Sequence, residues 1–148
     1  MKKSVALYDR AESGIFLAPD AVTTSGVLLS WDPPVRVAQE EKNEKLLPTV
    51  LELLDVAGQV VPHPTDFSNI GSSLYRLAGC KDWRSFAKKA KYCAIRSDES
   101  ELTLTPGYWD GRGFNTPKGV QRIGIPISCP PQQFLRALDE VLNAEPPT

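Results

Sequence analysis

The sequence is poor in the side chains that bind metals and form disulfides. It has one histidine, His63, inside a Pro-His-Pro segment, and three cysteines, Cys80, Cys93 and Cys129. A histidine-based metal site would have to recruit scattered cysteines and carboxylates, which is a poor ligand set. The odd cysteine count and the absence of C-x-x-C spacing are typical of reduced thiols in a cytoplasmic protein. We therefore expect no metal, no cofactor and no disulfide.

Long apolar runs and an excess of one charge are also absent. No stretch approaches the ~18 apolar residues of a membrane span, and the apolar part of residues 1–14 is shorter than a signal peptide needs. The chain has 17 basic and 18 acidic residues, a net charge of −1, whereas domains that bind DNA or RNA are usually basic. These absences predict a soluble, cytoplasmic protein with no membrane partner and no wholesale binding of nucleic acid.

Motifs of known catalytic chemistry are missing too. The sequence contains no G-x-S-x-G, no phosphate-binding glycine loop and no strand–G-x-G-x-x-G–helix pattern. Asp98, Glu99 and Glu101 stand close together, but in an expected hairpin loop, where charged residues are the norm. We predict no catalytic residue and no enzymatic activity.

Apolar periodicity predicts an α+β (α/β-like) fold. We expect residues 1–148 to form one domain, with a central, mostly antiparallel sheet of about five strands, three to four flanking helices and a frayed tail at 144–148. Period-two patterns predict strands at 4–8, within 15–31, and at 92–97, 101–106 and 120–127. Helical spacing predicts helices at 48–58, 70–79, 81–91 and 128–143.

The segment 81–91 is the most basic part of the chain. Trp83, Phe86, Ala87 and Ala90 recur at helical spacing, which puts the aromatic rings on a packed face and the cations on the opposite one. Stacking on nucleic acid would need aromatic and basic groups on the same exposed face. A nucleic-acid-binding or regulatory module, with affinity that falls steeply with salt, stays open as the alternative function. It would use Lys81, Arg84, Lys88, Lys89 and Lys91.

A second unusual segment, 107–119, is rich in glycine and aromatic residues. Tyr108, Trp109 and Phe114 are close together, and exposed Tyr, Trp and Arg are the residues most enriched in binding hot spots. Alternatively, Trp109 and Phe114 fold back and cover the sheet. The sequence favours neither interpretation.

Two stretches of the second half together resemble a known family. Residues 80–114, "CKDWRSFAKKAKYCAIRSDESELTLTPGYWDGRGF", and residues 120–143, "VQRIGIPISCPPQQFLRALDEVLN", resemble the CdiI immunity proteins of bacterial contact-dependent growth inhibition systems. The matching features are a Lys-x-Trp-x-x-Phe helix from Lys81, a strand with Cys93 and Ile95, the segment Leu102–Pro106, a final strand, and a closing helix after a Ser-Cys-Pro start. The resemblance covers residues 46–143 with gaps, and the first 40 only by the order of strands.

The resemblance implies a function that needs no chemistry. Such proteins bind the toxic C-terminal domain of their cognate CdiA effector, commonly a nuclease, in the cytoplasm and protect the producing cell. Relatives have a central antiparallel sheet with surrounding helices, and some accept a toxin hairpin at a sheet edge. Here the segment near Pro126, or the hairpin joined by Asp98 and Glu99, would offer such an edge.

We predict two sets of toxin contacts on this basis. The first set is Tyr108, Trp109, Asp110 and Arg112, in the aromatic segment. The second set is Asp98, Glu99 and Glu101, which would meet a basic toxin surface and so speed association.

Overall fold

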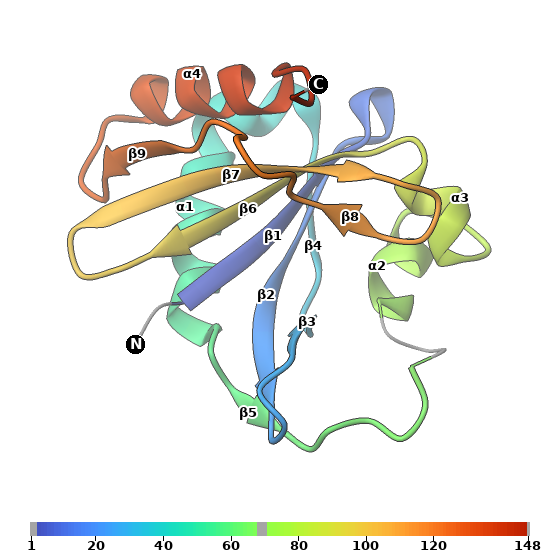
Figure 1. Ribbon diagram of the computed structural model, residues 1–148. Coiled ribbons are helices and arrows are strands. Elements are labelled where there is room, and N and C mark those ends of the chain that lie inside the picture. The colour runs from blue at the N-terminus through green and yellow to red at the C-terminus, as the bar shows by residue number, and fades with distance from the viewer. Residues whose placement is uncertain (1–2, 68–70, 148) are drawn as a thin grey trace.

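The fold is built on a ladder of four long antiparallel strands. A computed structural model describes residues 3–67 and 71–147. The strand β1 (Lys3–Asp9) lies between β2 (Ile15–Thr23) and β6 (Lys91–Ser97), and β7 (Glu101–Trp109) follows on the far side of β6. In register, Leu7 stands opposite Leu17 on one side and Cys93 on the other. Alternation along these strands therefore separates two faces of the sheet (Figure 1).

Five short strands extend the ladder, so the expectation of about five strands was too low. Within the described residues 3–67 and 71–147, all nine strands pair antiparallel with their neighbours, except that β5 pairs parallel with β2. Segments of two to four residues are too short to give a period-two signal, which is why the sequence did not predict them. They are β3 (Leu28–Ser30) and β4 (Val35–Val37) on β2, β5 (Val60–Val61), and β8 (Phe114–Asn115) and β9 (Ile123–Pro126) on β7.

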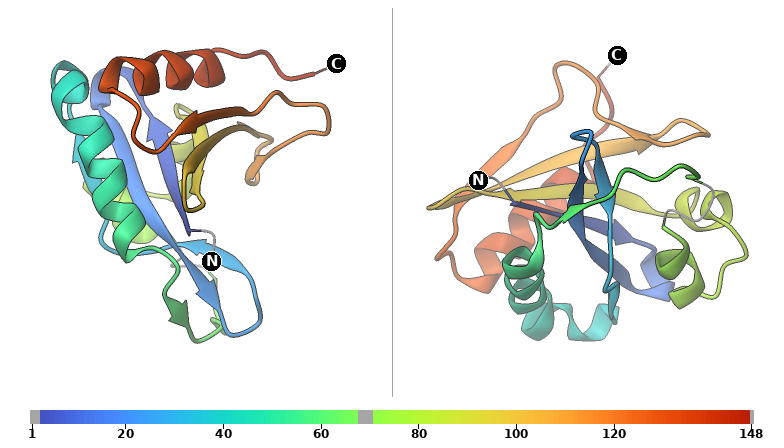
Figure 2. Two further views of the ribbon diagram at one scale, coloured as in Figure 1. Left: turned by 90° about the vertical axis from the view of Figure 1, so that its left-hand side faces the viewer. Right: turned by 90° about the horizontal axis from the view of Figure 1, so that it is seen from below.

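Two helices cover one face of the sheet and form the main core with it. Helices α1 (Lys42–Val56) and α4 (Pro131–Leu142) lie against the same face in all views (Figures 1 and 2). Burying apolar side chains contributes roughly 25 cal/mol per Å², so this layer supplies much of the stability. The side chains that meet there include Val5, Leu7, Val50, Cys93, Ile95, Leu102, Leu104, Phe134 and Leu138.

Helix α1 begins earlier than predicted. The sequence pattern placed its start near Pro48, but a turn of 3-10 helix (Gln39–Glu41) leads into it at Lys42 and Pro48 lies inside. Proline lacks an N–H and so leaves the carbonyl of Glu44 without its helical partner. Both residues are exposed, so water can bind that carbonyl and the helix continues.

The opposite face is covered over one part only. Helices α2 (Ser72–Leu77) and α3 (Trp83–Ala87) pack there on an aromatic cluster that includes Tyr8, Phe16 and Phe86. Asp82 caps α3, with its Oδ1 accepting a hydrogen bond from the Ser85 N–H at 2.8 Å. No helix of the described residues covers the remaining part of this face (Figure 1).

Two segments that were expected as helix are shorter in the structure. The predicted helix 81–91 ends at Ala87, because Lys91 already pairs with Asp9 in the β1–β6 ladder. The helix predicted over 70–79 is α2, and Ile70 lies outside the described residues. Residues 144–147 of the expected frayed tail form neither helix nor strand, and Thr148 lies outside the described residues.

Candidate functional site

The residues predicted as toxin contacts form two groups at opposite ends of β7. Glu101 begins this strand and Trp109 ends it, and eight steps of about 3.3 Å place them roughly 26 Å apart. The turn after β6 and the turn before β8 lie correspondingly far apart in Figure 1. The structure therefore does not bring the two sets into one compact site. We call them the acidic turn (Asp98, Glu99 and Glu101) and the aromatic turn (Tyr108, Trp109, Asp110 and Arg112).

In the acidic turn, Asp98 holds the backbone. Its Oδ1 accepts hydrogen bonds from the N–H groups of Ser100 and Glu101, at 2.9 and 2.8 Å. Aspartate commonly closes turns in this way. The carboxyl group of Glu101 lies over Gly124, where an added Cβ would come within 2.9 Å of it. Glu99 is exposed at the tip, so its carboxylate is the best placed of the three to meet a partner.

Asp110 has the same role in the aromatic turn. Its Oδ1 accepts hydrogen bonds from the N–H groups of Arg112 and Gly113, at 2.8 and 2.9 Å, and Oδ2 accepts one from the Asn115 side chain. These backbone donors stabilise the carboxylate and lower the pKa of Asp110. Asp110 therefore shapes this turn, while Arg112 projects into solvent.

Two aromatic residues of this turn, Tyr108 and Trp109, are the last residues of strand β7. Strand β7 runs on to Trp109 because Gly107, opposite Tyr92, has no side chain, and a Cβ there would lie 2.6 Å from the Tyr92 ring. The rings of Phe114 and Tyr92 stack with centroids 4.9 Å apart, so Phe114 does fold back onto the sheet. Trp109 packs against Phe114 at 5.4 Å and stays half-exposed.

Tyr108 ties the aromatic turn to the C-terminal segment. Its hydroxyl donates a hydrogen bond to the carbonyl of Ala144 at 2.9 Å. Desolvation, with a smaller effect from Glu145, raises the pKa of Tyr108. A hollow of about 210 Å³ lies beside this contact, between the end of β7 and the end of α4.

In the basic segment 81–91, the aromatic side chains and the basic side chains lie on different faces, as the sequence spacing predicted. Trp83 packs against Tyr8 and Phe86, with ring centroids 5.6 and 5.3 Å away. The five basic side chains, by contrast, are exposed. Trp83 is half-buried in the aromatic cluster and does not stand among the cations as a stacking platform.

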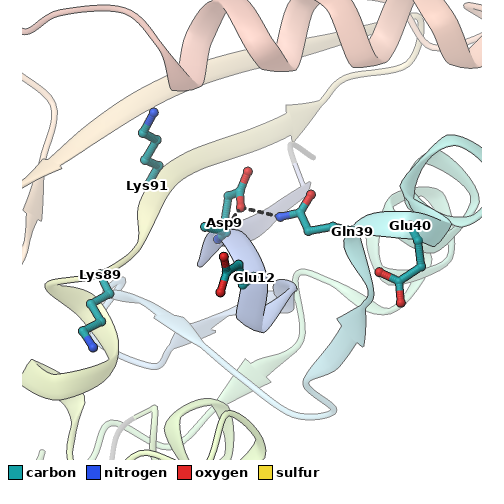
Figure 3. A pocket seen from close by; sticks show the side chains of 7 residues that line it. Asp9, Glu12, Gln39, Glu40, Lys89 and Lys91 are labelled. Carbon is teal, nitrogen blue, oxygen red and sulfur yellow. Dashed lines mark hydrogen bonds between the residues drawn. The ribbon is translucent and has the colours of Figure 1, made fainter.

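A wider hollow, of about 670 Å³, was not indicated by the sequence. Figure 3 shows Lys89 and Lys91 on one side of it and the carboxylates of Asp9, Glu12 and Glu40 across from them. Asp9 Oδ1 accepts hydrogen bonds from Gln39 Nε2 at 2.7 Å and from the Ala11 N–H at 2.9 Å. No sequence motif could have shown this group, because its members come from three separate segments, 9–12, 39–40 and 89–91.

The part of the second sheet face that carries no helix is polar. Asp20 is largely enclosed there and accepts a hydrogen bond from Ser4. Burial raises the pKa of Asp20, while the Ser4 hydrogen bond and the charge of Arg96 act in the opposite direction. Next to it, a hollow of about 170 Å³ is lined by Arg96, Ser97, Asp98, Thr103, Thr105 and Arg122. We call this the arginine hollow.

The described residues offer no arrangement that would hold a metal ion. Over residues 3–67 and 71–147, no three His, Cys, Asp or Glu side chains gather as ligands. His63 instead places its Nδ1 3.0 Å from the Thr23 hydroxyl. In the same part of the chain, no helix is both long and apolar enough to cross a bilayer.

These features define the chain as an α+β protein with a curled, mostly antiparallel sheet. The sequence matches no protein-family model and no curated protein. Two solved structures share the fold. A protein of unknown function from Neisseria meningitidis superposes with a TM-score of 0.74 at 15% identity, over 96% of this chain and 94% of that one.

The second similar structure is a chain of the CdiA-CT/CdiI toxin and immunity complex from Yersinia pseudotuberculosis. It superposes with a TM-score of 0.69 at 15% identity and covers 96% of each chain. Because nearly the whole of both chains is covered, the likeness concerns the complete fold and not a shared motif. The fold is therefore that of a chain of a CdiA-CT/CdiI complex, in agreement with the α+β fold that the sequence resemblance implied.

Proposed function

We propose that this protein is an immunity protein of a contact-dependent growth inhibition system. It would bind the C-terminal toxin domain of its cognate CdiA in the cytoplasm and block it, without catalysing a reaction. The observation that supports this most is the likeness, over 96% of both chains, to a chain of a toxin and immunity complex. The toxin would be a nuclease, as is common for such effectors.

The proposal predicts protection of cells. A cell that expresses the CdiA C-terminal domain encoded beside this gene should stop growing, and co-expression of this protein should restore growth. Expression of this protein alone should not slow growth, which separates an immunity protein from a toxin of the same fold. Loss of viability despite co-expression, or toxicity of this protein alone, would contradict the proposal.

The two turns of β7 are the proposed contact surfaces, and they should contribute differently. Trp109→Ala removes a half-exposed aromatic ring of the hot-spot type, so we expect about 30-fold weaker toxin binding through faster dissociation. Glu99→Lys reverses an exposed charge and should mainly slow association with a basic toxin surface. Surface plasmon resonance with the toxin domain measures both rates.

Glu52→Lys is the matched control for this comparison. It makes the same charge change at an exposed position of α1, away from β7. Its association rate should equal that of the wild type. If Glu99→Lys and Glu52→Lys slow association equally, the effect belongs to net charge and the acidic turn is not a contact.

A further inference from the structure

We propose that the arginine hollow receives one acidic side chain of the toxin. This inference rests on the proposed function, and it names the chemistry of the partner group at a site that shares only Asp98 with the predicted contacts. The hollow is lined from β6, β7 and the position before β9. No helix of the described residues covers these strands on the second sheet face (Figure 1), so a folded partner can reach the hollow.

Strand pairing puts two guanidinium groups on either side of β7. Arg96 on β6 stands opposite Thr103, and Arg122 comes just before Ile123, which stands opposite Leu104. With neighbouring strands about 4.8 Å apart, the two arginine backbones lie roughly 10 Å from each other. Side chains of this length can both reach a group held above Thr103 and Thr105.

The lining of the hollow fits a carboxylate. Guanidinium groups bind carboxylates through two parallel N–H···O bonds, and the hydroxyls of Thr103 and Thr105, on the same sheet face as the two arginines, add further donors. A volume of about 170 Å³ is below the ~300 Å³ at which small-molecule pockets begin. The space therefore suits a single side chain better than a free metabolite.

The surroundings favour a protein over a nucleic acid as the source of the anion. Asp98 lines the hollow itself, Glu99 and Glu101 follow it in the same turn, and Asp20 on β2 is close enough for the charge of Arg96 to lower its pKa. A polyphosphate backbone would place several negative charges against these carboxylates. A single Asp or Glu on a folded partner meets the two arginines and avoids most of that repulsion.

The inference is best tested at Arg122 and not at Arg96, because the charge of Arg96 also lowers the pKa of Asp20. Arg122 is exposed, so its replacement should leave the fold intact, which thermal unfolding can verify. We expect Arg122→Gln to weaken toxin binding about 10- to 100-fold in titration calorimetry, the usual loss for a charged hydrogen bond. Arg136→Gln, on the exposed side of α4, is the matched control and should bind as the wild type does.

A charge exchange identifies the group that is bound. Arg122→Glu should abolish measurable binding, and one Asp→Arg or Glu→Arg change among the toxin's surface positions should restore it at least tenfold. A fluorescent 12-nucleotide RNA, and inorganic phosphate against chloride at equal ionic strength, test the phosphate alternative.

The outcomes separate this inference from the proposed function. If the wild-type protein does not bind the toxin, the proposed function is wrong. If the wild type binds and Arg122→Gln binds equally well, the toxin does not use the hollow. If the RNA or phosphate binds the wild type but not Arg122→Gln, and no toxin charge exchange restores binding, the hollow is a phosphate site and the inference is overturned.

Discussion

Replacing Phe86 by alanine is expected to lower the free energy of unfolding by about 3–5 kcal/mol, the range measured for large-to-small changes in a core. Domains are typically stable by about 5–15 kcal/mol in total, so the variant should be marginal. Phe86 is fully buried, so alanine would leave a cavity in the aromatic cluster.

The size of this effect follows from the contacts of one ring. Its centroid lies 5.3 Å from that of Tyr8, 5.6 Å from Phe16 and 5.3 Å from Trp83. The guanidinium carbon of Arg10 lies 5.2 Å from the same ring, and Arg10 Nε donates to the Phe86 carbonyl at 3.1 Å. Alanine keeps that backbone hydrogen bond but removes the aromatic contacts and the cation–π contact.

Urea unfolding followed by circular dichroism measures the change. The midpoint should fall while the slope stays the same, as for a loss of stability without a change in the exposed area. Phe67→Ala is the matched control, because Phe67 is 48% exposed and should cost no more than about 1 kcal/mol. Equal losses for the two variants would mean that Phe86 is not the centre of the aromatic cluster.

The strands in which apolar residues occupy every second position were predictable from the sequence. Cys93 with Ile95, and Leu102 with Leu104, were assigned to shared strand faces, and all four are buried in the main core. The sequence spacing likewise put Phe86 inside and the basic residues outside. Long strands carry this signal in every second residue.

The features that were missed depend on contacts distant in sequence. Pro48 lies inside a helix because its neighbourhood is exposed, which no local pattern reveals. Strand β7 continues to Trp109 because the Tyr92 ring needs the space that Gly107 leaves. Both are outcomes of packing that override local preference.

The candidate site was predictable by residue type but not by arrangement. The sequence predicted Asp98 and Asp110 as toxin contacts. In the structure, the Oδ1 atom of each accepts hydrogen bonds from backbone N–H groups of its own turn. A signal for this role was present, since an aspartate two or three positions before glycine or serine is typical of such turns. The arginine hollow had none, because Arg96 and Arg122 meet only through the pairing of β6, β7 and β9.

Alkaline pH is expected to destabilise the protein through Cys93. Burial raises the pKa of this thiol to about 12, against about 8.5 in an unfolded chain. Above about pH 8.5 the folded protein keeps the thiol proton that the unfolded chain releases, so rising pH favours unfolding. The contribution of the buried, protonated thiol to the free energy of unfolding is therefore complete below about pH 8.5 and is lost as the pH rises towards 12. The loss is about 1.4 kcal/mol per pH unit, or roughly 2 kcal/mol by pH 10.

The variant Cys93→Ala isolates this contribution. Burial also raises the pKa of Tyr8 and Tyr92, and these groups destabilise both proteins alike above about pH 10. The difference in unfolding free energy between wild type and variant should be constant from pH 7 to 8 and then shrink by roughly 2 kcal/mol at pH 10. Urea titrations at each pH provide the values. A difference that stays constant to pH 10 would mean that solvent reaches the Cys93 thiol, and that the layer between the sheet and helices α1 and α4 is open.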